Sequence, residues 1–293
     1  MAKCMEATLN AGNDCGIGRQ SLLANGKCFQ WLSNQSLTHE LNNGRIAGPG
    51  EVPFAVWIVY RDKFIASHGS GVILNNRWIL TAAHVIYGFA ISDLTIYPGK
   101  LFIDYNDYEN GYNIEKTVVH YKYPRRRFPA YDMALIKLTA DLPLSSQLSI
   151  NGLNYRTLLN GICLPPLDAL NSEDELALMA GYGLVNRNEK SDRLKIGYIR
   201  IKKPYNNARD FWRMIILGER YPSYNGTFSC AGDSGAPLYQ YVNGRAVLIG
   251  ITKGRNTITY KCDEIVDSVY VVFVRISLFV DWIIDSIHNN DFI

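Results

Sequence analysis

The sequence predicts an all-β protein, a sandwich or a pair of barrels, with one helix at its carboxyl end. From residue 46 onward, short apolar stretches alternate with Gly, Pro, Asn and Asp, which is typical of many short strands joined by turns. A convincing helical period of apolar residues occurs only near the end of the chain. The 293 residues are 47% hydrophobic and 19% charged, a composition that is typical of globular proteins.

The strand-like stretches lie at 54–60, 71–74, 78–80, 134–138, 176–180 and 246–251. The helix is predicted over 278–288, because Leu278, Phe279, Trp282, Ile283 and Ile287 fall on one face there. Residues 1–45 show little sustained periodicity and hold half of the cysteines. The remaining body, 46–293, has a length that suits two adjacent small barrels with a shared interface.

Charge and hydropathy exclude two classes of protein. The net charge is +3 and the basic residues are spread along the chain, whereas a nucleic-acid-binding domain concentrates them on one face. The most apolar window, 269–284, is interrupted by Arg275 and Asp281, which excludes a membrane span. The first thirty residues lack the basic start and apolar run of a secretory signal, so we expect no signal peptide within this chain.

The cysteines indicate disulfides rather than a metal site or a redox motif. Their number is even, their spacing is wide, and no C-x-x-C pair occurs. Asn34 and Asn225 begin Asn-x-Ser/Thr sequences and are candidate glycosylation sites. We therefore expect a secreted, extracellular protein. The six cysteines are Cys4, Cys15, Cys28, Cys163, Cys230 and Cys262.

Three segments carry the residues of a nucleophilic site. Residues 78–84 read Trp-Ile-Leu-Thr-Ala-Ala-His, 131–138 read Tyr-Asp-Met-Ala-Leu-Ile-Lys-Leu, and 230–237 read Cys-Ala-Gly-Asp-Ser-Gly-Ala-Pro. A serine hydroxyl needs an imidazole to accept its proton, and the imidazole needs a carboxylate to orient it and to stabilise its cation. The sequence therefore predicts His84, Asp132 and Ser234 as the catalytic residues.

The glycines beside Ser234 also have a chemical reason. A turn without a side chain at Gly232 allows the backbone N–H groups of Gly232 and Ser234 to converge on an oxyanion. This chemistry needs no cofactor, and we predict no metal site. A hydrolase of the α/β type is excluded, because its nucleophile precedes the acid and the histidine in the chain, while here the order is His, Asp, Ser.

The motifs T-A-A-H, D-M-A-L-I-K-L and C-x-G-D-S-G-x-P, in this order and spacing, resemble those of chymotrypsin-like serine proteases. Supporting matches are Ile-Cys-Leu-Pro at 162–165, Gly-Tyr-Gly at 181–183, Val119 with His120, and Trp282 in the last helix. The resemblance implies two six-stranded antiparallel Greek-key β-barrels with a C-terminal α-helix, with His84 and Asp132 on the first barrel and Ser234 on the second. It gives His120 a structural role.

The same resemblance implies a zymogen. Residues 1–45 would be a pro-region that is tethered by a disulfide, and 46–293 the protease domain. Cleavage after Arg45 would free the amino group of Ile46, which would turn inward and pair with Asp233. The family usually has I-V-G-G at this point, whereas Pro49 here stiffens a stretch that must move.

The resemblance further implies the disulfides Cys230–Cys262, Cys28–Cys163 and Cys4–Cys15. Position 228, at the base of the family's specificity pocket, is Phe228 rather than the Asp of trypsin-like members. Lys253 and Arg255 lie in the segment that would pair with substrate, and Val271 lies near the pocket wall. These substitutions predict either a narrow preference for small apolar or acidic residues or a pocket that stays closed until a cofactor or substrate opens it.

Two functions remain open. The first is a secreted serine endopeptidase that is made as a zymogen, lacks trypsin-like specificity, and has as partners a protein or peptide substrate, an activating protease and a candidate protein inhibitor. The second is a catalytically weak or inactive homologue that acts as a binding or regulatory module. The complete set of triad residues favours the first, and the substituted pocket favours the second.

Overall fold

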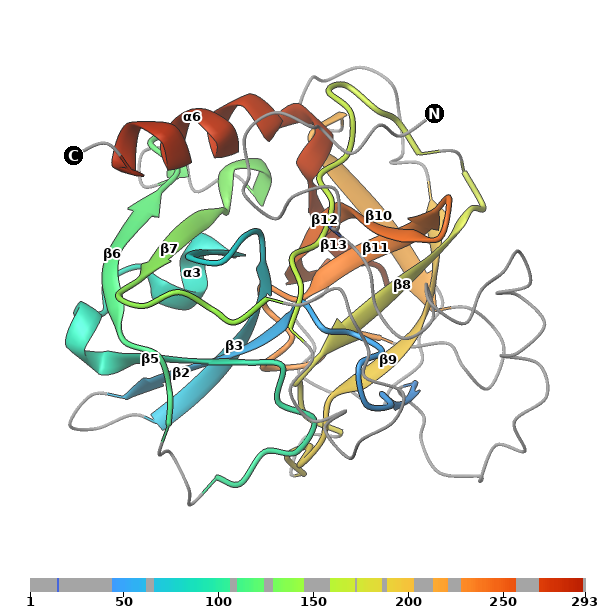
Figure 1. Cartoon of the computed structure of the whole chain (residues 1–293). Coiled ribbons are helices and arrows are strands. Elements are labelled where there is room, and N and C mark those ends of the chain that lie inside the picture. The colour runs from blue at the N-terminus through green and yellow to red at the C-terminus, as the bar shows by residue number, and fades with distance from the viewer. Residues whose placement is uncertain are drawn as a thin grey trace.

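The structure is a computed structural model that describes residues 15, 44–61, 66–105, 110–123, 129–144, 159–171, 173–185, 189–202, 213–220, 228–256 and 269–291. Its ordered elements are mostly β-strands, arranged in two barrels that lie side by side (Figure 1). The predicted fold class is confirmed. No helix in these ranges is long and apolar enough to cross a membrane.

The first sheet has six antiparallel strands in the order β5-β2-β3-β4-β7-β6. Its two edge strands approach each other only through a bridge between Ile96 and Tyr112, so the sheet is curled and not fully closed. The strands are β2 (Ala55–Arg61), β3 (Ala66–Ile73), β4 (Trp78–Thr81), β5 (Leu94–Pro98), β6 (Ile114–Val119) and β7 (Ala134–Leu138).

The second sheet closes completely. Its order is β9-β10-β13-β12-β11-β8, and β8 pairs again with β9. A short strand, β1 (Arg45–Ile46), adds to the outer side of β9. The barrel strands are β8 (Leu176–Gly181), β9 (Lys195–Lys202), β10 (Ile215–Arg220), β11 (Pro237–Val242), β12 (Arg245–Arg255) and β13 (Val271–Arg275).

Helices occupy little of the described chain. α3 (Ala83–Ile86) follows β4, and three 3-10 turns lie at Ile91–Asp93, Pro129–Tyr131 and Ile276–Leu278. The last turn leads into α6 (Val280–Asp291), which confirms the helix predicted near the carboxyl end. α6 buries Val280, Ile283 and Ile287, as its apolar period requires.

The largest apolar cluster reaches across both barrels, while a second cluster fills the interior of the second barrel. Trp57 and Trp78 of the first barrel and Tyr239 of the second belong to the same buried cluster. Phe54 packs edge-to-face against Tyr239 with 5.1 Å between ring centroids, and this contact joins the two barrels directly. The interface between the two barrels, which we call the seam, is therefore closely packed.

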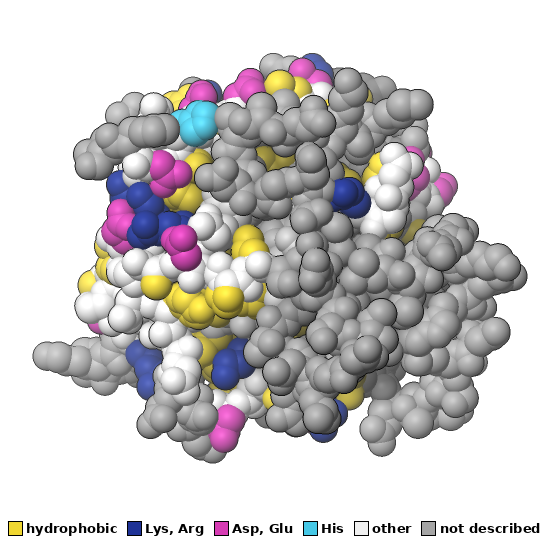
Figure 2. Space-filling model, viewed as in Figure 1, with side chains coloured by type: hydrophobic (Ala, Val, Ile, Leu, Met, Phe, Trp, Pro, Cys, Tyr) yellow, Lys and Arg dark blue, Asp and Glu magenta, His cyan; other side chains and the backbone are white. Residues whose placement is uncertain are grey.

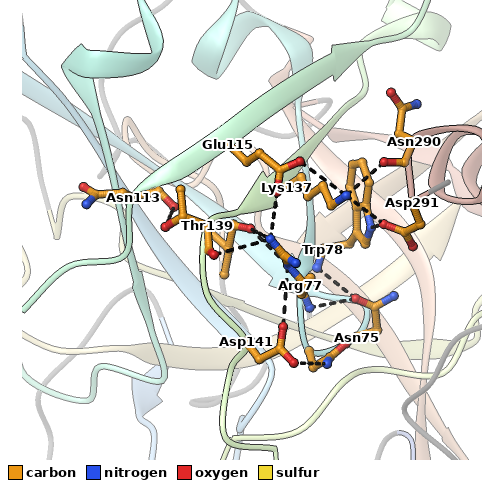
Figure 3. Close-up of polar contacts among 12 residues, drawn as sticks. Asn75, Arg77, Trp78, Asn113, Glu115, Lys137, Thr139, Asp141, Asn290 and Asp291 are labelled. Atoms are coloured by element: carbon orange, nitrogen blue, oxygen red, sulfur yellow. Dashed lines mark hydrogen bonds and ion pairs between the residues drawn. The ribbon is translucent and has the colours of Figure 1, made fainter. Parts of the chain in front are cut away.

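α6 is joined to the first barrel by a buried lysine and exposed acidic residues. Lys137 of β7 donates to the Asn290 carbonyl (2.9 Å) and pairs with Asp291 (3.1 Å) and Glu115 (3.4 Å). The indole N–H of Trp78 donates to the same Asp291 carboxylate at 3.0 Å (Figure 3). Acidic and basic side chains accordingly gather on the face beneath α6 (Figure 2).

The predicted disulfides need a correction. Cys163 is bonded to Cys15, so the predictions Cys28–Cys163 and Cys4–Cys15 are both wrong. The reason lies in contacts that sequence spacing does not reveal. Arg245, the first residue of β12, donates to the Cys15 carbonyl at 3.1 Å, and Cys163 bridges to Val247 of the same strand. Residue 15 is therefore held beside Cys163.

Cys230 is also disulfide-bonded, but its partner lies outside the described residues. Its predicted pairing with Cys262 stays a prediction. Cys4, Cys28 and both glycosylation candidates, Asn34 and Asn225, also lie outside the described residues.

Candidate active site

Asp132 holds His84 at two points. Its carboxylate accepts a hydrogen bond from the His84 ring at Nδ1 (2.7 Å) and a second from the His84 backbone N–H (2.9 Å). His84 lies in α3 after β4, and Asp132 lies just before β7, so the pairing of β4 with β7 brings the two together. Asp132 is 2% exposed. With Nδ1 engaged, the other ring nitrogen, Nε2, is left to accept a proton.

The loop that carries Ser234 is bonded to both barrels. The Ser234 carbonyl accepts from the Ser70 N–H of the first barrel (2.8 Å), and the Gly235 N–H donates to Thr252 of the second (2.8 Å). Gly235 has φ +84°, where a side chain would also collide with the Ser70 backbone. Ser234 is therefore fixed at the seam.

Ser234 and His84 belong to the same corner of the seam. A side chain at Gly69 would lie 2.7 Å from Val85, the residue after His84, and 3.3 Å from the Ser234 carbonyl oxygen. Val85 thus fills the space beside Gly69. Within the described chain, no hydrogen bond joins the Ser234 hydroxyl to the His84 ring, a bond that is often long without substrate.

The turn formed by Gly232, Asp233 and Ser234, which we call the oxyanion turn after its predicted role, is supported from the first barrel. Gly232 has φ +95°, its carbonyl accepts from the Ser70 hydroxyl at 2.9 Å, and a side chain there would overlap the His68 ring. The His68 ring in turn bonds through Nε2 to the Tyr182 carbonyl at 3.0 Å. Sequence reasoning missed His68, because a histidine in a short strand carries no catalytic motif.

Asp233 is buried beneath this turn. Its carboxylate accepts from the backbone N–H groups of Gly183 and Cys230, each at 2.8 Å. Side chains at Gly181 or Gly183 would collide with that carboxylate, which explains the glycines of the Gly-Tyr-Gly segment. Burial raises the pKa of Asp233 to about 6, although the two backbone hydrogen bonds and the nearby Lys195 act in the opposite direction.

Comparison with known proteins agrees with this geometry. A family model described as Trypsin matches residues 41–283. The chain belongs to the trypsin family. It is 30% identical to U21-ctenitoxin-Pn1a of Phoneutria nigriventer over 224 residues, which cover 71% of this chain and 86% of the relative. It is 25% identical to chymotrypsin-like elastase family member 1 of Macaca fascicularis over 260 residues, or 85% of this chain and 91% of the relative.

Human tissue-type plasminogen activator is 26% identical over 230 residues, which cover 74% of this chain. The match spans only 38% of that protein's length. The family match and the similarity to these relatives together identify the chain as a homologue of serine proteases with the trypsin fold.

The predicted activation site of this trypsin-family chain lies in regular structure. Arg45 pairs with Ile196 in the β1–β9 register, and its guanidinium binds the Glu51 carboxylate through two contacts. The side chain of Glu51 is 6% exposed, and Glu51 also accepts from the Gly48 N–H at 2.9 Å. The Arg45–Ile46 bond is thus held in a strand, with Arg45 only 20% exposed. Sequence reasoning did not anticipate Glu51.

Three of the predicted pocket residues meet. The Arg255 guanidinium lies over the Phe228 ring, 5.5 Å from its centroid, and Arg255 pairs with the buried Val271 between β12 and β13. Lys253 is half-buried on the same strand. Among the described residues, no group of His, Cys, Asp and Glu is arranged to hold a metal ion.

Proposed function

We propose that this trypsin-family chain is a serine endopeptidase that cleaves protein substrates through an acyl-enzyme. The observation that carries the proposal is the double hold of Asp132 on His84, because a carboxylate that bonds both the ring and the backbone serves to fix one imidazole orientation. Ser234 at the same corner of the seam supplies the nucleophile.

In the proposed mechanism, the Ser234 oxygen attacks the carbonyl carbon of the scissile bond while His84 Nε2 takes the hydroxyl proton. The backbone N–H groups of Gly232 and Ser234 stabilise the oxyanion that forms. When the C–N bond breaks, the His84 imidazolium gives its proton to the leaving amine. A water molecule then attacks the acyl-enzyme by the same route and restores the Ser234 hydroxyl. Asp132 stabilises the imidazolium in both halves.

We propose further that the protein is secreted and is made as a zymogen that is cut after Arg45. The disulfide Cys15–Cys163 and the disulfide of Cys230 support an oxidising compartment. Because Arg45 is bound to Glu51 within a strand, an activating protease would have to detach β1 before it could cut.

We propose a specificity that differs from that of trypsin. Arg255 over Phe228 makes the pocket aromatic and basic, which disfavours Arg and Lys in the substrate and favours small apolar or acidic residues. Profiling a peptide library tests this proposal, and efficient cleavage after Arg or Lys would contradict it.

A fluorophosphonate probe tests the catalytic proposal. The probe is added to the intact chain and to the chain cut after Arg45, and the adduct is located by mass spectrometry, with Ser234→Ala as the control. Labelling at Ser234 in either form supports the endopeptidase. No labelling in either form, with the fold intact by circular dichroism, favours the second function, an inactive homologue that acts as a binding module. The stacked Arg255 and Phe228 are the observation that keeps this second function open.

A further inference from the structure

Lys195 is a buried cation that no sequence motif marks. It is the first residue of β9 and is buried, and among the described residues its Nζ has no hydrogen-bond partner. A buried ammonium without a partner is unfavourable by several kcal/mol, unless a counter-charge compensates it. Its surroundings should therefore contain that counter-charge.

The register of β9 puts Lys195 next to Asp233. Lys195 pairs with Gly181 across β8, and the Asp233 carboxylate packs directly against the backbone of Gly181. Lys195 and Asp233 line one small cavity together with Gly183 and Phe228. No ion pair joins the two charges among the described residues, although both side chains line the same cavity.

The opposite edge of β9, where β1 pairs, places Lys195 beside the predicted activation site. Ile46, whose amino group would pair with Asp233 after cleavage, is directly across from Lys195 in the β1–β9 register. Ile46 is 44% exposed and its nitrogen is part of a peptide bond, so in the uncleaved chain it supplies no charge. The Lys195 ammonium thus lies on the residue directly across from Ile46, whose amino group would be the ammonium after cleavage.

We propose that in the uncleaved chain the Lys195 ammonium pairs with Asp233 and holds the oxyanion turn in its working form, so that the single chain is active before any cut after Arg45. This inference rests on the proposed endopeptidase function. Lys195 is a positioning residue, because it acts through Asp233 and does not touch the reacting atoms.

The charges around Lys195 favour the pair. Asp233 is the acid that acts most strongly on it, followed by Glu189 and Asp192. Burial lowers the pKa of Lys195 and raises that of Asp233, and each group moves the other's pKa back toward its charged form. The binding of Arg45 to Glu51 also favours this proposal. While the Arg45–Ile46 bond is held in a strand and remains uncut, only a side chain can supply the ammonium for Asp233.

The test compares Lys195→Met, Lys195→Arg and Lys202→Met with the wild-type chain. Lys202 is on the same strand but pairs at the surface with Asp174 (3.0 Å), so it is a matched control for loss of a lysine. The readout is the rate of fluorophosphonate labelling at Ser234, taken only from molecules whose intact mass shows the uncut chain. Thermal unfolding confirms that each variant is folded.

We expect Lys195→Met to slow labelling of the uncut chain by about 10²-fold, the scale of losing one oxyanion contact. Lys195→Arg should keep most of the rate, and Lys202→Met all of it. A cut after Arg45 should restore labelling to Lys195→Met, because the Ile46 amino group then supplies the missing charge. Such rescue by a distant cut is not expected of a lysine that only fills space.

Several outcomes would overturn the proposal. Wild-type labelling of the uncut chain with an unchanged rate in Lys195→Met would remove the role of Lys195 and leave the endopeptidase function standing. Equal losses in Lys195→Met and Lys195→Arg, without rescue by the cut, would assign Lys195 to packing alone. Labelling of the wild-type chain only after the cut would show that Lys195 does not replace Ile46. Absence of labelling in every form would remove the endopeptidase function itself.

Discussion

The two halves of the candidate active site are held in different ways. On the first barrel, His84 is fixed by two direct hydrogen bonds to one buried carboxylate, and these bonds need no further event. On the second barrel, Asp233 is held by neutral backbone donors, and its charge lacks a direct cationic partner among the described residues. We infer that control of this site lies in the half whose buried acid has no side-chain partner among the described residues.

The largest expected effect concerns the half that is already fixed. Asp132→Asn keeps the shape of the side chain but removes the charge and presents the wrong hydrogen-bonding partner to His84 Nδ1. Turnover or probe labelling at Ser234 should fall by about 10⁴-fold, the scale that related triads show. Rates measured beside Asp281→Asn, an exposed aspartate of α6, provide the comparison. A loss below tenfold would mean that His84 does not depend on Asp132.

The second prediction concerns the conditional half. Asp233→Asn brings an amide N–H₂ group against the N–H donors of Gly183 and Cys230 and abolishes the acceptor for any ammonium. Labelling should fall by about 10²- to 10³-fold, both before and after a cut at Arg45. Asp192→Asn, which changes an exposed acid near Lys195, should retain the wild-type rate. Full activity of the cut form of Asp233→Asn would show that the second half of the site does not depend on the Asp233 charge.

A third prediction separates stability from activity on the first barrel. Lys137→Met removes the buried ammonium that joins Asn290, Asp291 and Glu115, and with it the hydrogen bond and both ion pairs. The free energy of unfolding should fall by about 2 kcal/mol, measured by urea denaturation at pH 7. The labelling rate per folded molecule should stay within twofold of wild type. A large loss of rate with unchanged stability would connect α6 to the catalytic half.

The smallest expected effect is a dependence of stability on pH. Burial, followed by the nearby Lys122, lowers the pKa of His120 to about 4, below the value of about 6.5 in an unfolded chain. The unfolded state therefore binds more protons between these values, and stability should be lost as the pH falls from about 6.5 to 4, by roughly 1–2 kcal/mol.

Urea denaturation of wild type and His120→Gln across this range measures the effect. The variant should show a flatter pH profile, because its side chain does not titrate. Identical slopes for the two proteins would show that His120 contributes nothing. Since His120 packs against Tyr131 and Trp282, the outcome also reports on how firmly α6 is joined to the first barrel.

The sequence predicted the fold class and the association of His84 with Asp132, because a nucleophilic serine needs both groups and because the motif segments resemble those of chymotrypsin-like proteases. It did not predict the partner of Cys163, since chain spacing contains no information about where residue 15 is held. Lys195 looks like any polar residue of a strand. Only its register with Gly181, and the place of Asp233 against that glycine, distinguish it.

The disulfide between Cys15 and Cys163 has a practical consequence for anyone who isolates this protein. A cut after Arg45 would leave both pieces joined, so the product would run as a single band on a non-reducing gel and would release no peptide into solution. Processing would become visible only after reduction. The residues before Arg45 would also stay covalently attached to the rest of the chain, so that proteolysis at this bond would not separate them from it.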